Sequence, residues 1–537
     1  MAMTNGHSSP IKLDALIVGA GFGGCYLLNI LRKEGLSTKV VEAGTTLGGV
    51  WSWNRYPGAR VDVEVPYYGF SDPAIWGTYL WPERFPSDTE LRRYFQHVDK
   101  VWGLSKDIEL NTKVVEANFV NQSWEVTTSS GQVYCCKYFL ACTGTSFKQY
   151  IPEWKGRDKF KGIMHHSSLW PEEPVDLTGK RIAIIGAGST GVQVLQEAAK
   201  VATHVTQFIR TPNYALPMRQ REVSEEEIYA YKSQFPHVFK ALRNTAAGLP
   251  MEKPDRNIMD TPPEERKVIW DELWKRGGFN WSHGGFADVS VNKEANRIQY
   301  DYWVTKTRAR MTDPRKKDLL APLEPSYYIG TKRPSLEQDY YECADQPNVE
   351  ITNSPITEFT ENGIRTEEKT TDFDIVVICT GYDAVTGGLR TMGIKGRDGL
   401  DLDEKWSKGV STHLGMMVNG FPNMYIVYGP QAPTSFTNGP PFIELQCEWI
   451  RDVITRQERE NIVTAEASKE AEAAWRDGVI KMANQTLLVE TNSWYMGANV
   501  PGKQREFLLY VGGLPAWKNA CEDALEDWRG FQVQKAA

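Results

Sequence analysis

The sequence predicts an α/β fold in which two Rossmann-like domains carry a helical insertion. Two segments of the chain share one order of features: a short apolar strand, a glycine-rich turn and an amphipathic helix. A third segment, residues 221–328, is charged, aromatic and helical in pattern. The two repeated segments therefore predict the α/β units, and the third predicts the insertion.

The first α/β unit begins with the apolar run at 15–18, which is typical of a buried parallel strand. This run is followed by the three glycines of a G-x-G-x-x-G pattern, Gly19, Gly21 and Gly24. In that pattern the first glycine makes a tight turn, the second lets the backbone approach a pyrophosphate, and the third allows a helix to pack closely on the strand. The helix starts near Phe22, and a second strand at 39–41 ends in Glu42, an acid placed to bind ribose hydroxyls.

The second unit begins with the strand at 181–185, and its turn holds Gly186, Gly188, Thr190 and Gly191. The next strand, 205–209, ends in Arg210 and Thr211 rather than in an acid. A carboxylate at this place repels the 2′-phosphate of NADP, whereas an arginine can bind it with two hydrogen bonds. This difference predicts FAD in the first site and NADPH in the second, unless Arg210 is only a solvated surface charge.

Two further apolar strands end in the dipeptide Thr-Gly, at 143–144 and at 380–381. We interpret both as crossings between the two domains, so that the second domain is inserted into the first. The predicted division is an FAD-binding first part at 1–147, an NADP-binding first part at 148–220, the helical insertion at 221–328, an NADP-binding return at 329–379 and an FAD-binding second part at 380–537.

The helical insertion carries two signals for helix N-termini. Ser224 stands three residues before Glu227, and Thr261 stands three residues before Glu264 with prolines between them. We therefore expect helices capped by Ser224 and Thr261. The charged runs of the insertion are interpreted as solvated faces, which leaves its aromatic residues to cover the cofactor domains.

Composition argues against several classes of function. The chain has 61 Lys and Arg against 68 Asp and Glu, a net charge of -7, which disfavours a nucleic-acid-binding surface. No apolar run could span a membrane, and the first ten residues lack the core of a secretory signal, so we expect a cytoplasmic protein. The eight cysteines have neither metal-ligand spacing nor a CxxC pair, so we expect no metal and disfavour a disulfide oxidoreductase. No obligate protein partner is implied.

A longer pattern lies between the two α/β units. Its residues fit F-x-G-x-x-x-H-x-x-x-W-P through Phe160, Gly162, His166 and Trp170. A second pattern joins Gly49 and Trp51 to a Tyr-Pro-Gly turn and then to Asp62. With these motifs and its two glycine turns, the chain resembles the Baeyer–Villiger monooxygenases, flavin enzymes of the cyclohexanone and phenylacetone monooxygenase type. The resemblance covers nearly the whole chain.

The resemblance implies roles for three residues outside the glycine turns. Arg333 would lie against the flavin and stabilise the negative charge of the reacting oxygen. Asp62 would pair with Arg333 and orient its guanidinium. Lys332 would hold the 2′-phosphate beside Arg210. The alternative for Arg333 is an ion pair at an interface between domains.

Other residues of the resemblance serve binding or positioning. Trp494 matches the tryptophan that reaches the nicotinamide side, although a plain core aromatic is an equal reading. Thr380 and Gly381 match family contacts at the second crossing, where cysteine replaces the family's usual alanine before both Thr-Gly pairs. In the family, His166 positions the linker rather than acting as a base.

The activity implied by the resemblance is insertion of one oxygen atom from O2 next to a ketone carbonyl, which gives an ester or a lactone. NADPH reduces FAD, a C4a-peroxyflavin forms, and its addition to the ketone gives a Criegee intermediate. The alternatives are oxidation of amine nitrogen or sulfide sulfur, a redox sensor without turnover, and an NADPH oxidase that releases H2O2. The Gly/Pro-rich loop 431–441 is either a wall of the substrate pocket or an ordinary surface loop.

Overall fold

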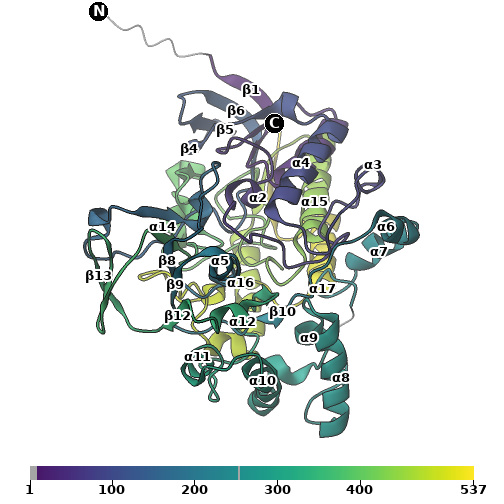
Figure 1. Ribbon diagram of the computed structural model, residues 1–537. Coiled ribbons are helices and arrows are strands. Elements are labelled where there is room, and N and C mark those ends of the chain that lie inside the picture. Colours follow the sequence, from purple (N-terminus) through teal and green to yellow (C-terminus); the bar gives the residue numbers. More distant parts are fainter. Residues whose placement is uncertain (1–8, 252–253, 537) are drawn as a thin grey trace, which may run out of the picture.

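The computed structural model describes residues 9–251 and 254–536 of the chain. Two largely parallel sheets organise it, and helices surround both of them (Figure 1). Residues 1–8, which belong to the stretch on which the expectation about a secretory signal rests, lie outside the described part. Within that part no helix is both long and apolar enough to cross a membrane.

The larger sheet is built around β1 (Ile11–Val18), which pairs in parallel with β6 (Val133–Ala141) and with β2 (Thr38–Val41). The C-terminal half of β1 is fully buried, as expected for a central parallel strand. Helix α1 (Phe22–Lys33) follows β1 and packs against α15 (Gly439–Arg459). The other strands of this sheet are β3 (Ile108–Glu109), β4 (Val114–Val120), β5 (Ser123–Thr128), β17 (Ile394–Lys395) and β18 (Met424–Ile426).

The second sheet has five parallel strands in the order β12-β9-β8-β16-β7. Helix α5 (Ser189–Val201) joins β8 to β9. In sequence, this sheet lies between β6 and β17, so one sheet is formed within the course of the other. Its strands are β7 (Ile163–His166), β8 (Arg181–Ile185), β9 (His204–Phe208), β12 (Val349–Thr352) and β16 (Ile375–Ile378). The predicted α/β class is confirmed, whereas the residue boundaries of the five parts stay a prediction.

The described part of the segment predicted as a helical insertion consists of helices joined by turns and loops. The helices within 263–320 lie at the lower end of the molecule in Figure 1, whereas those within 225–242 lie at its right side. The buried indole of Trp303 donates a hydrogen bond to the carbonyl of Ala215, 2.9 Å away, which ties α10 to the second sheet's connections. The helices are α6 (Glu225–Lys232), α7 (Phe235–Leu242), α8 (Pro263–Arg276), α9 (Asn280–His283), α10 (Lys293–Arg308) and α11 (Pro314–Leu320).

One of the two predicted helix caps in this segment is confirmed and the other is wrong. The Ser224 hydroxyl accepts a hydrogen bond from the backbone N–H of Glu227, 3.2 Å away. Helix α8, however, has Pro262 at its cap position and no side-chain cap. The hydroxyl of Thr261 instead donates backwards to the carbonyl of Asn257, 2.7 Å away. The Thr261 hydroxyl therefore bonds within the preceding turn and is not used to cap the helix.

The remaining elements form small sheets and peripheral helices. Two short sheets pair β10 (Leu216–Pro217) with β11 (Leu336–Glu337) and β19 (Ile462–Ala467) with β20 (Phe531–Lys535). A third has the order β13-β14-β15, with β14 (Gly363–Thr366) between β13 (Ile356–Phe359) and β15 (Thr370–Asp372). The remaining α-helices are α2 (Val50–Trp53), α3 (Pro73–Trp76), α4 (Asp88–Trp102), α12 (Tyr340–Ala344), α13 (Gly387–Arg390), α14 (Leu402–Trp406), α16 (Lys469–Ala483) and α17 (Leu514–Glu526).

Candidate active site

The first glycine turn needs glycine for steric reasons that the structure makes explicit. Gly19 has a φ of +103°, and a Cβ there would lie 2.6 Å from the carbonyl oxygen of Cys142 at the end of β6. A Cβ on Gly24 would lie 1.8 Å from the carbonyl oxygen of Gly19. Both contacts are with backbone, so no side-chain movement could relieve them. The turn therefore packs tightly between the end of β6 and the start of α1, and the N-terminus of α1 faces a pocket.

The second glycine turn repeats this construction. Gly186 has a φ of +126°, and its Cβ would lie 2.3 Å from the carbonyl oxygen of Cys379, which ends β16. A Cβ on Gly191 would lie 2.2 Å from the carbonyl oxygen of Gly186. Gly188, by contrast, has open space where its Cβ would be. In both units, therefore, the carbonyl of the cysteine before Thr-Gly packs against the first glycine of the turn.

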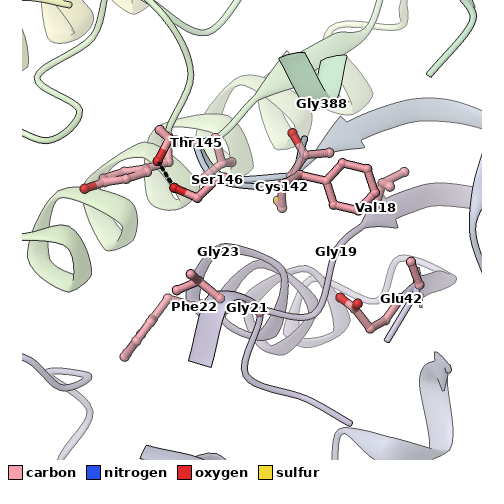
Figure 2. A pocket seen from close by; sticks show the side chains of 18 of the residues that line it. Val18, Gly19, Gly21, Phe22, Gly23, Glu42, Cys142, Thr145, Ser146 and Gly388 are labelled. Carbon is pink, nitrogen blue, oxygen red and sulfur yellow. Dashed lines mark hydrogen bonds between the residues drawn. The ribbon is translucent and has the colours of Figure 1, made fainter. Parts of the chain in front are cut away.

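A pocket opens at the first turn and is lined by most of the residues predicted for FAD. Figure 2 shows Glu42 and Phe22 on the side of the glycine turn, with Cys142, Thr145 and Ser146 across the pocket. The predicted residues that line it are Gly19, Gly21, Phe22, Glu42, Gly49 and Trp51. Gly24 does not line the pocket, because its place is in the packing of helix on strand.

Glu42 is buried beside this pocket at the end of β2. Its carboxylate accepts hydrogen bonds from the backbone N–H groups of Ala20, 2.8 Å away, and Gly44, 2.6 Å away. A carboxylate oxygen has lone pairs for more than one bond, so Glu42 can accept from these backbone groups and from a ribose hydroxyl together. The glycine cradle and this acid fit the adenosine and pyrophosphate portion of FAD.

A second pocket joins residues that are far apart in the sequence. It is lined by the second glycine turn, the end of β9, the Lys-Arg pair and the second Thr-Gly crossing. The predicted residues that line it are Gly186, Gly188, Thr190, Arg210, Thr211, Lys332, Arg333, Thr380, Gly381 and Trp494. Gly191, like Gly24, lies behind the turn instead. Thr145 and Ser146 line this pocket as well as the first one.

Positive charge gathers at one end of the second pocket. Lys332 donates from Nζ to the hydroxyl of Thr211 across 3.2 Å, and its ammonium lies 4.5 Å from the ring centre of Tyr327. Burial and the nearby charge of Arg210 lower the pKa of Lys332. In the described part of the chain, neither Lys332 nor Arg210 has a carboxylate within ion-pair distance. The two cations therefore fit the 2′-phosphate of NADPH.

Arg333 and Asp62 form an ion pair, as the resemblance implies. The guanidinium places Nε 2.8 Å and Nη2 2.7 Å from Oδ2 of Asp62. On its other side, Nη1 donates to the carbonyl oxygen of Ser435 across 2.7 Å, and the ring centre of Phe279 lies 5.1 Å away. Although burial alone would lower it, the Asp62 carboxylate raises the pKa of Arg333, which keeps the guanidinium charged.

These contacts leave part of the guanidinium free. Arginine carries five N–H donors, and the bonds to Asp62 and Ser435 use one edge of the group and one hydrogen of Nη1. At least two donors thus have no partner among the described residues. Since Arg333 lines the second pocket, these donors can stabilise an anion that forms there.

Aromatic and imidazole groups surround the ion pair. Tyr68, Tyr428 and Tyr495 are each close enough to Arg333 for its charge to act on their pKa. Burial, followed by the Arg333 charge, lowers the pKa of His283 to about 4, so its imidazole is neutral at neutral pH. Sequence reasoning missed these residues, because neither a tyrosine nor a lone histidine in a helical segment carries a distinctive pattern.

The residues of the F-x-G-x-x-x-H-x-x-x-W pattern line neither pocket. His166 ends β7, where Nε2 lies 3.2 Å from the carbonyl oxygen of Gly381 and Nδ1 lies 2.8 Å from the hydroxyl of Ser168. A Cβ on Gly162 would lie 2.6 Å from the Phe160 ring, and Trp170 is buried. The pattern thus joins the linker to the second Thr-Gly crossing, and a positioning role for it stays a prediction.

The loop 431–441 is largely buried, so the interpretation as an ordinary surface loop is wrong. Its Ser435 carbonyl accepts a hydrogen bond from Arg333.

Trp494 lines the second pocket, where its ring packs edge-to-face with Tyr495 at 4.4 Å between ring centres.

Comparison with known proteins identifies the family of this chain. The model of the flavin-binding monooxygenase-like family matches residues 12–244. The FAD-binding monooxygenase acrE of Aspergillus aculeatus is 43% identical over 99% of this chain and 90% of its own length. Cyclopentanone 1,2-monooxygenase of Comamonas sp. is 40% identical over 97% of this chain and 96% of its own. This chain belongs to the flavin-binding monooxygenase-like family.

Solved structures of this family share the whole fold. Cyclohexanone monooxygenase from Rhodococcus sp. Phi1, bound to NADP+, is 35% identical, with a TM-score of 0.95 over 98% of this chain and 100% of that chain. The OTEMO complex with FAD and NADP is 33% identical, with a TM-score of 0.93 over the same shares. A relative with another named reaction, phenazine N-monooxygenase PhzNO1 of Lysobacter antibioticus, is 36% identical over 96% of this chain and 96% of its own. The predicted resemblance to Baeyer–Villiger monooxygenases is confirmed.

Proposed function

We propose that this chain is an FAD- and NADPH-dependent Baeyer–Villiger monooxygenase. A ketone, O2, NADPH and a proton give an ester or lactone, NADP+ and water, so that one oxygen atom enters next to the carbonyl carbon. The kinship with cyclic-ketone monooxygenases favours cyclic ketones as the substrate class. A cytoplasmic location fits this proposal, because all eight cysteines are free thiols, and the reaction needs no partner protein.

The observation that carries the proposal is the state of Arg333. Its guanidinium is clamped by Asp62 and by the Ser435 carbonyl, yet at least two N–H donors remain available at the second pocket. A fixed, permanently charged donor group stabilises negative charge on a reacting oxygen without having to reorganise. A nucleophilic oxygen and the oxyanion formed from a ketone both need such stabilisation.

The cofactor sites give the other residues their proposed roles. In the first pocket, the glycine turn and Glu42 would hold the pyrophosphate and ribose of FAD. In the second pocket, Lys332 and Arg210 would hold the 2′-phosphate of NADPH. FAD, when bound, would accept hydride from NADPH and activate O2. Trp494 and Thr380 would flank the nicotinamide end.

Isotope-labelled oxygen tests this proposal directly. The purified protein is incubated with FAD, NADPH, 18O2 and cyclopentanone or cyclohexanone, and products are identified by mass spectrometry. We expect a lactone that carries one 18O atom, and NADPH consumption that matches lactone formation. NADPH consumption with only H2O2 as product, across a panel of cyclic and open-chain ketones, would contradict the proposal.

N-oxygenation is a second candidate, favoured by the similarity to the phenazine N-monooxygenase. The two reactions need oxygen donors of opposite character, because a ketone carbon is electrophilic whereas an amine nitrogen or sulfide sulfur is nucleophilic. The panel therefore includes phenazine and a thioether beside the ketones. Formation of an N-oxide with no ester would favour the second candidate, and a sulfoxide beside the ester would add sulfides to the accepted substrates.

A further inference from the structure

Backbone strain is concentrated in the segment that follows β18. Tyr428, Gln431 and Ser435 have φ values of +61°, +58° and +66°, in the left-handed region that non-glycine residues seldom occupy. A bulky residue such as tyrosine keeps this conformation only where the surrounding structure holds it there. Most of the segment is buried, and its Ser435 carbonyl contacts Arg333 of the Arg333–Asp62 pair, so the restraints on the segment bear on the site.

Hydrogen bonds from several elements provide these restraints. The backbone N–H of Tyr428 donates to the side chain of Gln446 in α15, 2.8 Å away. The backbone N–H of Gln431 donates to the carbonyl of Leu508, 2.7 Å away, and its side chain accepts from Thr412. The segment is thereby fixed to the rest of the protein at Tyr428 and at Gln431, before the chain reaches Ser435.

Ser435 is held on both sides of its α-carbon. Its backbone N–H donates to the hydroxyl oxygen of Tyr428 across 3.3 Å. Its carbonyl oxygen accepts the bond from Nη1 of Arg333 across 2.7 Å. Rotation of Ser435 out of the left-handed region would turn both peptide groups, so it would break the bond to Tyr428 and the bond to Arg333 together.

We propose that Tyr428 is a positioning residue for Arg333, which acts through the peptide groups of Ser435. This inference rests on the proposed function. Asp62 holds the guanidinium only along the edge of Nε and Nη2, so the group can pivot about that edge. The Ser435 carbonyl stops the pivot, and Tyr428 keeps that carbonyl in place. The free donors of Arg333 then point in one fixed direction.

The state of the phenol agrees with this role. Burial raises the pKa of Tyr428, although the Arg333 charge and the bonds to Ser435 oppose the shift, so the hydroxyl stays neutral. Tyr428 also lines the first pocket, so the same residue borders the flavin site and bonds to the segment that contacts Arg333.

A matched pair of tyrosine variants tests the proposal. Tyr428→Phe removes only the oxygen that accepts from Ser435. Tyr425→Phe, in β18 three residues earlier, removes a buried hydroxyl that accepts from Gln457 across 2.6 Å. In each variant we measure the rate of flavin reduction by NADPH, and the share of consumed NADPH that appears as ester rather than as H2O2.

For Tyr428→Phe we expect the ester share to fall at least about fivefold while flavin reduction stays within about twofold of the wild type. For Tyr425→Phe we expect both quantities to stay near the wild-type values. The reduction rate in the same sample also reports that the protein is folded and holds both cofactors.

Two results would overturn the inference. One is an ester share in Tyr428→Phe equal to that in Tyr425→Phe, which would show that the Ser435 bond does not position Arg333. The other is an equal fall of flavin reduction and ester share in Tyr428→Phe, which would show a general structural defect. A wild type that forms no ester from any ketone would instead contradict the proposed function.

Discussion

Lys332 donates a hydrogen bond from its ammonium group to the hydroxyl of Thr211 across 3.2 Å, although 121 positions of the chain separate the two residues. Burial, together with the nearby charge of Arg210, lowers the pKa of Lys332. Two neighbouring cations without an acidic partner in the described part of the chain are unfavourable unless an anion joins them. The cluster therefore predicts how the protein distinguishes its two reductants.

The first prediction concerns the choice between NADPH and NADH. Arg210→Ala removes a charge-assisted contact to the 2′-phosphate, which is absent from NADH. We expect the KM for NADPH to rise about 10- to 100-fold, and the KM for NADH to change little. Steady-state kinetics with both reductants measure the effect. An unchanged ratio of the two KM values would remove Arg210 from this role.

The second prediction concerns the pH dependence of NADPH binding. A lysine with a lowered pKa loses its proton at a lower pH than an ordinary lysine does, so the attraction of Lys332 for the 2′-phosphate is present below that lowered pKa and is lost as pH rises through it. We expect the affinity for 2′,5′-ADP to weaken as pH rises, at a lower pH than an ordinary lysine would give. Lys332→Arg should flatten this profile, because a guanidinium stays charged. Calorimetric titration at several pH values checks both proteins.

The third prediction separates reduction of the flavin from oxygen insertion. Arg333→Ala removes the free donors, and Asp62→Asn removes the charge that holds the guanidinium. We expect NADPH to bleach the flavin in both variants, while ester formation falls about 100- to 1,000-fold in Arg333→Ala and less in Asp62→Asn. Arg365→Ala, on the exposed face of β14, serves as a control. Ester formation at the wild-type rate in Arg333→Ala would exclude this residue from the mechanism.

The fourth prediction uses two glycines of one turn. A Cβ on Gly191 would lie 2.2 Å from a backbone oxygen, whereas a Cβ on Gly188 would meet no atom within 4 Å. We expect Gly191→Ala to lower the free energy of unfolding by about 1–3 kcal/mol or more. Gly188→Ala should leave the free energy of unfolding near the wild-type value but weaken NADPH binding, because the methyl group occupies the approach of the pyrophosphate. Thermal unfolding and calorimetric titration distinguish the two effects. Equal unfolding temperatures would contradict the steric argument.

The parts of this protein that could be predicted from sequence are those with local causes. The two glycine turns, their strands and the switch from Glu42 to Arg210 follow from residues that are close together in the chain. Thr261 shows the limit of such reasoning, because its hydroxyl bonds to Asn257 in the preceding turn rather than capping the helix. The pairing of Asp62 with Arg333 came from the family resemblance and not from any local pattern.

The contacts that could not be predicted involve groups without a residue signature. The oxygen that Arg333 contacts in Ser435 is a backbone carbonyl, which every residue possesses. Ser435 has a left-handed φ, its N–H donates to the hydroxyl of Tyr428, and the N–H of Tyr428 donates in turn to Gln446. The Gly/Pro-rich composition of this loop marked it as unusual, but could not decide whether it was buried.

Thr145 and Ser146 follow the first Thr-Gly crossing and line both pockets. A single substitution at either residue consequently changes both pockets. Its effect on the retention of flavin and its effect on the Kd for the nicotinamide nucleotide would be correlated without any signal travelling through the molecule. Such a correlation in a mutational scan is thus the mark of a shared wall, and coupling between the sites must be sought at residues that touch only one of them.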